Sequence, residues 1–346
     1  MRGGRHIAAV SDAAFDLAPG ECLALVGESG CGKSVLASAL LGLLPGNAQT
    51  AGSALLGSTG PTAADAADAA VELLTATERQ LAGTLRGRRI GLIPQSPAAH
   101  LTPVRTVRSQ LEETVREVTR APRAALRAAA ECAADRASLP LDHLDRYPHQ
   151  LSGGLAQRAA TALALVGNAP VLLADEPTTG LDRELVDSTV DELRRHVDDG
   201  HALLMITHDL AAAERIADRV AVMYAGRIVE LADADTFFGE PGPRHPYARG
   251  LLDALPERAF LPIPGNPPEL GALPAGCAFA TRCDRATDAC DALPERTGGA
   301  ACHHPIVDVS DVSDVPEARE LPGYAEAAER EQLSHLPLAG GPQCSN

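Results

Sequence analysis

The stretch LSGGLAQRAATALALVGNAPVLLADEPTTGLD, residues 151–182, decides the fold. It reads as a turn rich in serine and glycine, a helix, a short apolar strand and two adjacent carboxylates. The apolar run 171–174 is typical of a buried parallel strand, and Asp175 and Glu176 follow it where open α/β sheets bind ligands. One carboxylate could hold a metal ion while its neighbour acts on water. The alternative is a strand that ends in two solvated acids.

A second stretch, CLALVGESGCGKS at 22–34, runs from an apolar strand through a glycine-rich turn into a helix. Gly27, Gly32, Lys33 and Ser34 satisfy the phosphate-loop pattern G-x-x-x-x-G-K-[ST] in the strand–loop–helix context that it requires. Backbone N–H groups of such a loop surround phosphate oxygens, and the helix N-terminus adds a favourable partial charge. The lysine reaches the β- and γ-phosphates and the serine hydroxyl binds Mg²⁺. These residues predict a nucleotide site.

The composition agrees with a nucleotide site in a globular protein. Among 30 basic residues Lys33 is the single lysine, so a compact ammonium was required there while arginine serves elsewhere. The net charge of −16 argues against a nucleic-acid partner. A hydrophobic content of 45% suffices for one large domain and a smaller one. Without an 18-residue apolar run or a secretory leader, we expect a cytosolic protein that meets a membrane only through a partner.

Periodicity predicts the remaining elements in order: a loose segment with an alanine-rich helix over 50–85, a strand leading to Ile93, helices over 104–140 broken at Pro122, a buried strand before His208 and a hairpin over 219–231. Gln95 and His208 each lie just past a strand. Such side chains usually serve turns or local structure, but beside a phosphate site Gln95 could touch Mg²⁺ or water and His208 the γ-phosphate.

The ordered set of the Lys33 loop, Gln95, LSGG, LLADEP, Leu181-Asp182 and His208 resembles the nucleotide-binding subunit of ABC transporters over roughly residues 5–235. The resemblance implies an α/β P-loop NTPase fold, with a nucleotide-binding domain over 1–235 and an inserted helical subdomain at about 96–158. It implies ATP hydrolysis with ATP and Mg²⁺ as cofactors.

The same resemblance implies a role for each residue of the site. Glu176 would polarise the attacking water, His208 would contact the γ-phosphate, and Gln95 would link the site to membrane subunits. Mg²⁺ would be held by Ser34, Gln95 and Asp175. The nucleotide-binding positions would be Gly27, Glu28, Ser29, Gly30, Cys31, Gly32, Lys33, Ser34, Val35 and Asp175.

Part of the site is expected to serve a second chain. By the same resemblance, Ser152, Gly153 and Gly154 would bind the γ-phosphate of a nucleotide held by another subunit. Asp182 would then lie at the dimer interface. The chain therefore supplies half of each of two composite sites.

Three further stretches, GRRIGLIPQSP, LTPVRTV and RHPYARGLLDALP, are similar to the ATP-binding subunits of oligopeptide, dipeptide and nickel importers. So is PIPGNPPELGALPAGCAFATRC, within a C-terminal extension over 236–305. The implied partners are a second, related but distinct ATPase subunit in a heterodimer, two transmembrane permease subunits and an extracytoplasmic substrate-binding protein. The protein would lie peripherally on the cytoplasmic face of the cell membrane. Peptides are the preferred cargo, with nickel or another small solute as the alternative.

Cys277, Cys283, Cys290 and Cys302 form a cluster with the spacing C-x5-C-x6-C-x11-C. Four thiols this close in a cytosolic protein favour a metal over disulfides. The spacing lacks the C-x2-4-C pairs usual for zinc. An iron–sulfur cluster tolerates varied spacing, and some peptide-importer subunits with a similar pattern carry one. We therefore expect [4Fe-4S], with zinc or free structural thiols as alternatives.

The last segment, 306–346, is expected to be a disordered acidic tail, because its residues 307–346 hold eight acids, two arginines and no apolar periodicity. Two rival functions remain. A soluble ABC ATPase of DNA repair or translation would carry long coiled coils or a second motif set. A redox-sensing regulator would use the cysteine cluster as its main site.

Overall fold

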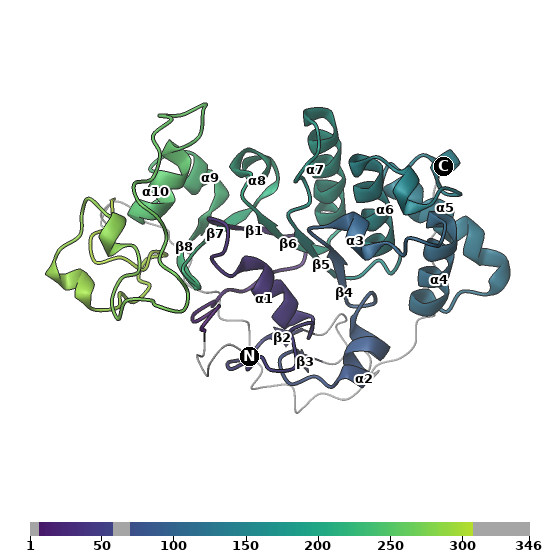
Figure 1. Cartoon of the computed structure of the whole chain (residues 1–346), viewed down its shortest axis with the longest axis horizontal. Coiled ribbons are helices and arrows are strands. Elements are labelled where there is room, and N and C mark those ends of the chain that lie inside the picture. The colour runs from purple at the N-terminus through teal and green to yellow at the C-terminus, as the bar shows by residue number, and fades with distance from the viewer. Residues whose placement is uncertain (1–6, 58–69, 307–346) are drawn as a thin grey trace, which may run out of the picture.

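A computed structural model describes residues 7–57 and 70–306 of the chain, which is built around a six-stranded sheet (Figure 1). The strand order is β4-β5-β6-β1-β7-β8. All neighbours run parallel except β8, which pairs antiparallel with β7. The strands are β1 Cys22–Val26, β4 Ile90–Ile93, β5 Val171–Asp175, β6 Ala202–Thr207, β7 Arg219–Tyr224 and β8 Arg227–Asp233. The predicted α/β fold is confirmed.

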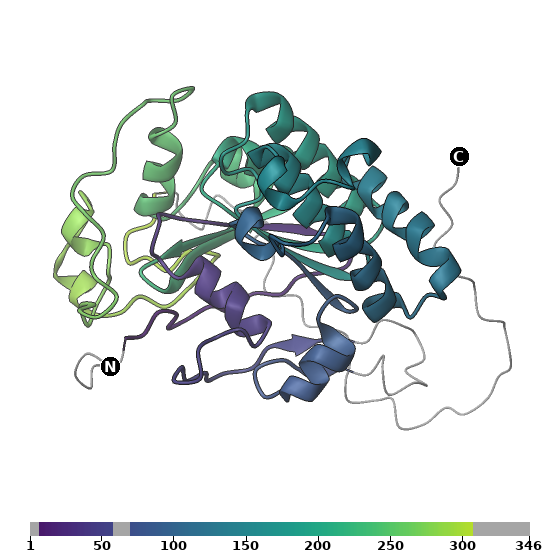
Figure 2. The same cartoon turned by 45° about the vertical axis from the view of Figure 1, so that its right-hand side comes forward.

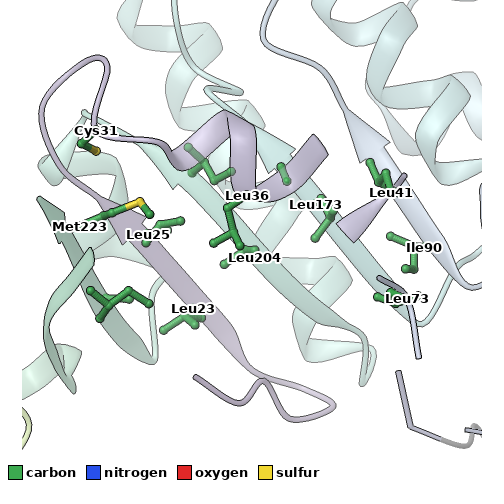
Figure 3. Packing of buried hydrophobic residues seen from close by; sticks show 14 of the residues in the cluster. Leu23, Leu25, Cys31, Leu36, Leu41, Leu73, Ile90, Leu173, Leu204 and Met223 are labelled. Atoms are coloured by element: carbon green, nitrogen blue, oxygen red, sulfur yellow. The ribbon is translucent and has the colours of Figure 1, made fainter. Parts of the chain in front are cut away.

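Helices cover both faces of this sheet (Figures 1 and 2). On one face, Leu36 of α1 (Lys33–Leu40) lies in one buried cluster with Leu23 and Leu25 of β1 (Figure 3). The other face packs against α6, α7 and α8, which span Gly153–Leu165, Arg183–Asp198 and Leu210–Ile216. Successive side chains of a strand point to opposite faces of the sheet. All five residues of β1 are apolar and buried, so both faces of this strand are covered, as expected of a strand in the middle of a parallel sheet.

A small antiparallel pair, β2 (Leu55–Leu56) and β3 (Val71–Glu72), lies below α1 in Figure 1. It is followed by α2 (Glu78–Gln80) and a π-helical turn over Leu81–Leu85. The predicted alanine-rich helix is wrong at Val71 and Glu72, which form β3 instead. Residues 64–69 of that predicted helix lie outside the described residues. The Glu72 carboxylate accepts the N–H of Ala54 at 2.7 Å, which ties the chain to β2 and competes with helix formation.

The helical segment that precedes α6 forms a separate layer. Its helices are α3 Pro97–His100, α4 Val107–Thr119 and α5 Leu126–Arg136. Leu111 and Val115 of α4 pack against alanines of α5 and α6 in one buried cluster. Pro122 lies between α4 and α5, as predicted, because proline cannot continue a helix.

The C-terminal extension shares a core with the sheet. It begins within α9 (Ala234–Phe238) and contains α10 (Pro246–Asp253) and two 3₁₀ turns, Ala280–Arg282 and Asp288–Asp291. Tyr247 and Phe279 pack in the same cluster as Val222 and Tyr224 of β7. The backbone of the extension also bonds to the β8 edge, from Leu231 N to Gly299 O at 2.8 Å and from Ala301 N to Val229 O at 2.8 Å. The extension therefore covers an edge that would otherwise be open.

Two further expectations concern the C-terminal tail and membrane-spanning helices. The predicted disordered tail lies outside the described residues, apart from Ile306. Within 7–57 and 70–306, none of the helices is long and apolar enough to span a membrane.

A buried carboxylate fastens the start of α10. Glu230 of β8 accepts the N–H groups of Arg244 and His245, each at 2.8 Å. His245 caps α10 by accepting the N–H of Tyr247 at 3.0 Å. Burial raises the pKa of Glu230 to about 7 and lowers that of His245 to about 4. The RHPY stretch thus begins a helix, with Pro246 at its first position, where proline is favoured.

Replacement of this carboxylate should change the pH dependence of stability. The pKa of Glu230 is raised on folding, so the stability that it contributes is complete below its unfolded pKa and is lost as pH rises through about 7. Between about pH 5.5 and 8, the unfolding free energy of the natural chain should fall by about 2 kcal/mol relative to Glu230→Gln. Urea unfolding measures this difference. Exposed Glu257→Gln is the control, and a pH-independent difference would contradict the account.

Candidate functional site

The glycine-rich loop between β1 and α1 is held tightly on two sides. Gly27 has φ 152°, and a Cβ there would lie 2.2 Å from the carbonyl oxygen of Met223. Gly32 has φ 110°, and a Cβ would lie 2.4 Å from the carbonyl oxygen of Ala9. Both positions therefore require glycine, and the loop has one well-defined path over the strand ends.

Lys33 folds back over this loop. Its side chain is buried, with 6% of the residue exposed, and Nζ donates to the carbonyl oxygens of Gly27 at 2.7 Å and Glu28 at 3.1 Å. Cys31 lies beside it, with Sγ 3.8 Å from Nζ, and burial raises the pKa of that thiol. A positive charge fixed among backbone groups is suited to binding a phosphate oxygen.

Ser34 and Asp175 meet at the carboxyl end of β5. Ser34 Oγ donates to Asp175 Oδ1 at 3.1 Å. Burial raises the pKa of Asp175, and the nearby Glu176 raises it further, while Ser34 and Lys33 lower it. A hydroxyl and a desolvated carboxylate are hard oxygen ligands, so this pair fits a small cation such as Mg²⁺.

Glu176 is turned by a left-handed backbone, with φ 52°. Its N–H donates to the carbonyl oxygen of Ile206 at 2.8 Å, and its Oε2 accepts from His208 Nδ1 at 2.6 Å and Thr179 Oγ1 at 3.2 Å. Glu176 is 7% exposed, whereas the His208 side chain is 58% exposed. A strained residue in a sharp turn, with its carboxylate oriented by donors from His208 and Thr179, is typical of a catalytic position.

The structure thus brings together five predicted residues at one edge of the sheet: Lys33, Ser34, Asp175, Glu176 and His208. Gln95 lies two residues past β4, which ends at the same edge, and is exposed. Among the described residues it makes no hydrogen bond to those five. The predicted contact of Gln95 with Mg²⁺ or water stays a prediction.

The residues predicted to serve a second chain lie at two helix N-termini. Ser152 caps α6 by accepting the Leu155 N–H at 3.3 Å, and Asp182 caps α7 by accepting the Leu185 N–H at 3.0 Å. Gly153 is exposed, and a Cβ there would meet nothing within 4 Å. Gly154 is buried against Leu185. Ser152, Gly153 and Asp182 are therefore accessible to a partner.

Two residues of the extension touch the loop and were not predicted from the sequence. Arg282 donates to both carboxylate oxygens of Glu28, at 2.8 and 3.0 Å, and the Tyr247 hydroxyl accepts the Glu28 N–H at 2.8 Å. They lie more than 200 residues from the loop in the chain. No local pattern marks such a contact.

The predicted iron–sulfur cluster is not supported. No group of three or more His, Cys, Asp or Glu side chains in the described residues is arranged to hold a metal ion. Cys277, Cys283, Cys290 and Cys302 are free thiols. Burial raises the pKa of Cys302 to about 11 and raises the pKa of Cys277 and Cys283 above the usual range of a thiol. Electrostatic interaction of Cys302 with the other three thiols shows that the four lie near one another, but among the described residues they do not form a metal site.

Comparison with known families gives two matches. Residues 10–179 match the ABC transporter family, and residues 229–290 match the oligopeptide/dipeptide transporter C-terminal region. The first match contains the phosphate loop and both carboxylates. The second contains the segment with Tyr247 and Arg282.

Curated relatives cover most of the chain. The oligopeptide transport ATP-binding protein of Escherichia coli is 38% identical, over 87% of this chain and 88% of the relative. The dipeptide transport ATP-binding protein of Bacillus subtilis is 37% identical, over 83% of this chain and 84% of the relative. The predicted resemblance is confirmed.

Solved structures agree on the fold. A dimeric ATP-binding cassette in a post-hydrolysis state bound to ADP and phosphate aligns with a TM-score of 0.55 at 24% identity, covering 65% of this chain and 90% of that one. A dimeric bacterial ABC transporter cassette aligns with the same TM-score at 25% identity and the same coverage.

Two alanine substitutions in the loop should separate strain from collision. Gly27→Ala would drive Cβ into a backbone oxygen, whereas at Gly30, with φ 83°, a Cβ meets nothing within 4 Å. Gly30→Ala should lower the free energy of unfolding by about 1–2 kcal/mol through backbone strain alone. Gly27→Ala should weaken binding of a fluorescent ATP analogue at least about 100-fold, or about 2.7 kcal/mol. Equal affinities of the two variants would show that the loop is not held as described.

Proposed function

Because the chain belongs to the ABC transporter family of ATP-binding proteins, we propose that it is the ATP-hydrolysing subunit of a peptide importer. The observation that carries the proposal is the cluster of Lys33, Ser34, Asp175, Glu176 and His208 at one edge of the sheet. The names of the relatives and the matched C-terminal region favour peptides over nickel or another small solute. ATP and Mg²⁺ are the proposed cofactors, without a metal cluster at the four cysteines.

The loop over 27–35 would hold the phosphates of ATP. Lys33 would turn its ammonium from the carbonyl oxygens of Gly27 and Glu28 to the β- and γ-phosphates, at little cost because it stays buried and bonded. Ser34 and Asp175 would hold Mg²⁺, which neutralises phosphate charge when bound. Fixed charges in a desolvated site stabilise the charge that develops during transfer.

Glu176 would orient the attacking water. The water oxygen forms a bond to the γ-phosphorus, the bond from that phosphorus to the β–γ bridging oxygen breaks, and the water proton passes to Glu176. The hydrogen bond from His208 Nδ1 prevents the carboxylate from rotating away, and His208 is exposed enough to contact the γ-phosphate as well. Catalysis by positioning and charge is the usual strategy for phosphoryl transfer.

A second ATPase subunit would complete the site. Gly153 is exposed and its own chain leaves room for a side chain there, so the reason for glycine lies outside the chain. A nucleotide held by a partner and approached by Ser152 and Gly153 provides that reason. We propose a heterodimer, with Asp182 at its interface.

Two permease subunits would dock on Gln95 and the helical subdomain at about 96–158. Val104, Leu141 and Tyr147 of this segment are large apolar side chains that are exposed, as expected of a docking surface. An extracytoplasmic binding protein would deliver the peptide to the permeases. The chain would then lie on the cytoplasmic face of the membrane, as a nucleotide-binding domain over 1–235 followed by the extension over 236–305.

Glu176→Gln tests the assignment of the water-orienting group. In the complex with its membrane partners, this variant should lose at least about 100-fold in ATP turnover, because an amide cannot accept the proton. Its dissociation constant for ATP should change little. Glu184→Gln, at an exposed position in the first turn of α7, is the matched control. Retained turnover in Glu176→Gln would remove Glu176 from the mechanism.

Gly153→Asp tests the composite site. The isolated chain should fold normally, since a carboxylate in the first turn of α6 is favourable and a Cβ at this position meets nothing within 4 Å. In the assembled complex, turnover should fall at least about ten-fold, because the carboxylate would repel the partner's γ-phosphate. Gly46→Asp makes the same change at another exposed glycine with space for a Cβ. Equal turnover in the two variants would exclude Gly153 from a shared site.

A further inference from the structure

The phosphate loop is held from outside the nucleotide-binding core by one ion pair. Arg282, at the end of a 3₁₀ turn in the extension, binds both carboxylate oxygens of Glu28, with Nη1–Oε2 at 2.8 Å and Nη2–Oε1 at 3.0 Å. Glu28 directly follows the first glycine of the loop. The two residues are separated by 254 positions, so this bidentate ion pair connects the N-terminal and C-terminal parts of the chain.

The guanidinium of Arg282 is fixed before it meets Glu28. Its side chain is only 3% exposed. Nε donates to the carbonyl oxygen of Pro264 at 2.7 Å, and Nη1 also donates to the hydroxyl of Tyr224 at 3.2 Å. The cation lies 5.8 Å from the ring centre of Tyr224 and 5.7 Å from that of Phe279. An arginine that is bonded and stacked in this way is preorganised to bind a carboxylate. A lysine could not form the same bidentate pair, because it has a single ammonium group.

The extension also holds the backbone of Glu28. Tyr247, which is fully buried, accepts the Glu28 N–H at 2.8 Å, while Lys33 donates to the Glu28 carbonyl oxygen at 3.1 Å. The N–H and the carboxylate of Glu28 are therefore both bound by residues of the extension. The N–H of Glu28 is directed to Tyr247 and away from a loop ligand.

We propose that Arg282 is a positioning residue for ATP binding, which pairs with the Glu28 carboxylate and so neutralises a negative charge inside a loop that must hold a polyanion. The proposal rests on the proposed function of the loop as the ATP site. It gives the C-terminal extension a task in the ATPase itself. Loss of the pair would leave an uncompensated, half-buried carboxylate next to the triphosphate.

The defect expected of Arg282→Gln is electrostatic. Fluorescent ATP analogue binding to the purified full chain should weaken at least about ten-fold, and the KM of the assembled complex should rise in parallel with kcat nearly unchanged. Added salt should reduce the defect, because it screens the repulsion. Arg282→Lys keeps the positive charge but cannot form the bidentate pair, so its affinity for the ATP analogue should fall less than that of Arg282→Gln. Arg285→Gln, three residues on and exposed, is the matched control.

A double variant separates charge from folding. Removal of the Glu28 charge as well, in Glu28→Gln with Arg282→Gln, should recover part of the affinity that Arg282→Gln loses. If Arg282 only supports the fold, the double variant stays as weak as the single one and salt has no effect, which overturns the proposal. Unchanged affinity in Arg282→Gln also overturns it. A natural chain that binds no ATP analogue would instead reject the proposed function.

Discussion

The site depends on one backbone hydrogen bond, from the N–H of Glu176 to the carbonyl oxygen of Ile206 at 2.8 Å. It continues the parallel ladder of β5 and β6 by one residue, after which Glu176 enters a left-handed turn. That register places Asp175 against Ser34 and turns the carboxylate of Glu176 to His208. A slip of one residue would send both acids to the opposite faces and separate them from the loop.

The second constraint is that the loop is not an independent motif. Gly27 is pressed against β7 and Gly32 against the N-terminal segment, so the loop takes its path from both. The extension adds Arg282 and Tyr247 to Glu28 and shares a hydrophobic core with β7. The extension also bonds to the edge of β8, so a structural change in the extension can affect the loop through directly contacting residues.

Much of the site could be predicted from the sequence because its residues end apolar strands. The run 171–174 was predicted as a buried parallel strand and CLALV as an apolar strand that leads into the phosphate loop. Because ligands bind at the carboxyl ends of such strands, the Lys33 loop and the two carboxylates were expected at one edge of the sheet. The alanine-rich helix failed where Val71 pairs in a strand, since propensity yields to a tertiary partner. The Arg282–Glu28 pair could not be predicted, because long-range pairs leave no periodic trace. The cysteine spacing could not give the directions of the thiols.

We propose that ATP hydrolysis at this half-site drives peptide uptake through membrane partners. The most direct measurement is ATP-dependent accumulation of labelled peptide in proteoliposomes that contain the chain, its second ATPase subunit and the permeases, with the binding protein supplied. We expect accumulation with ATP and Mg²⁺, and none when the chain is omitted. Hydrolysis that proceeds at the same rate without the membrane partners, and with no movement of peptide, would contradict the account.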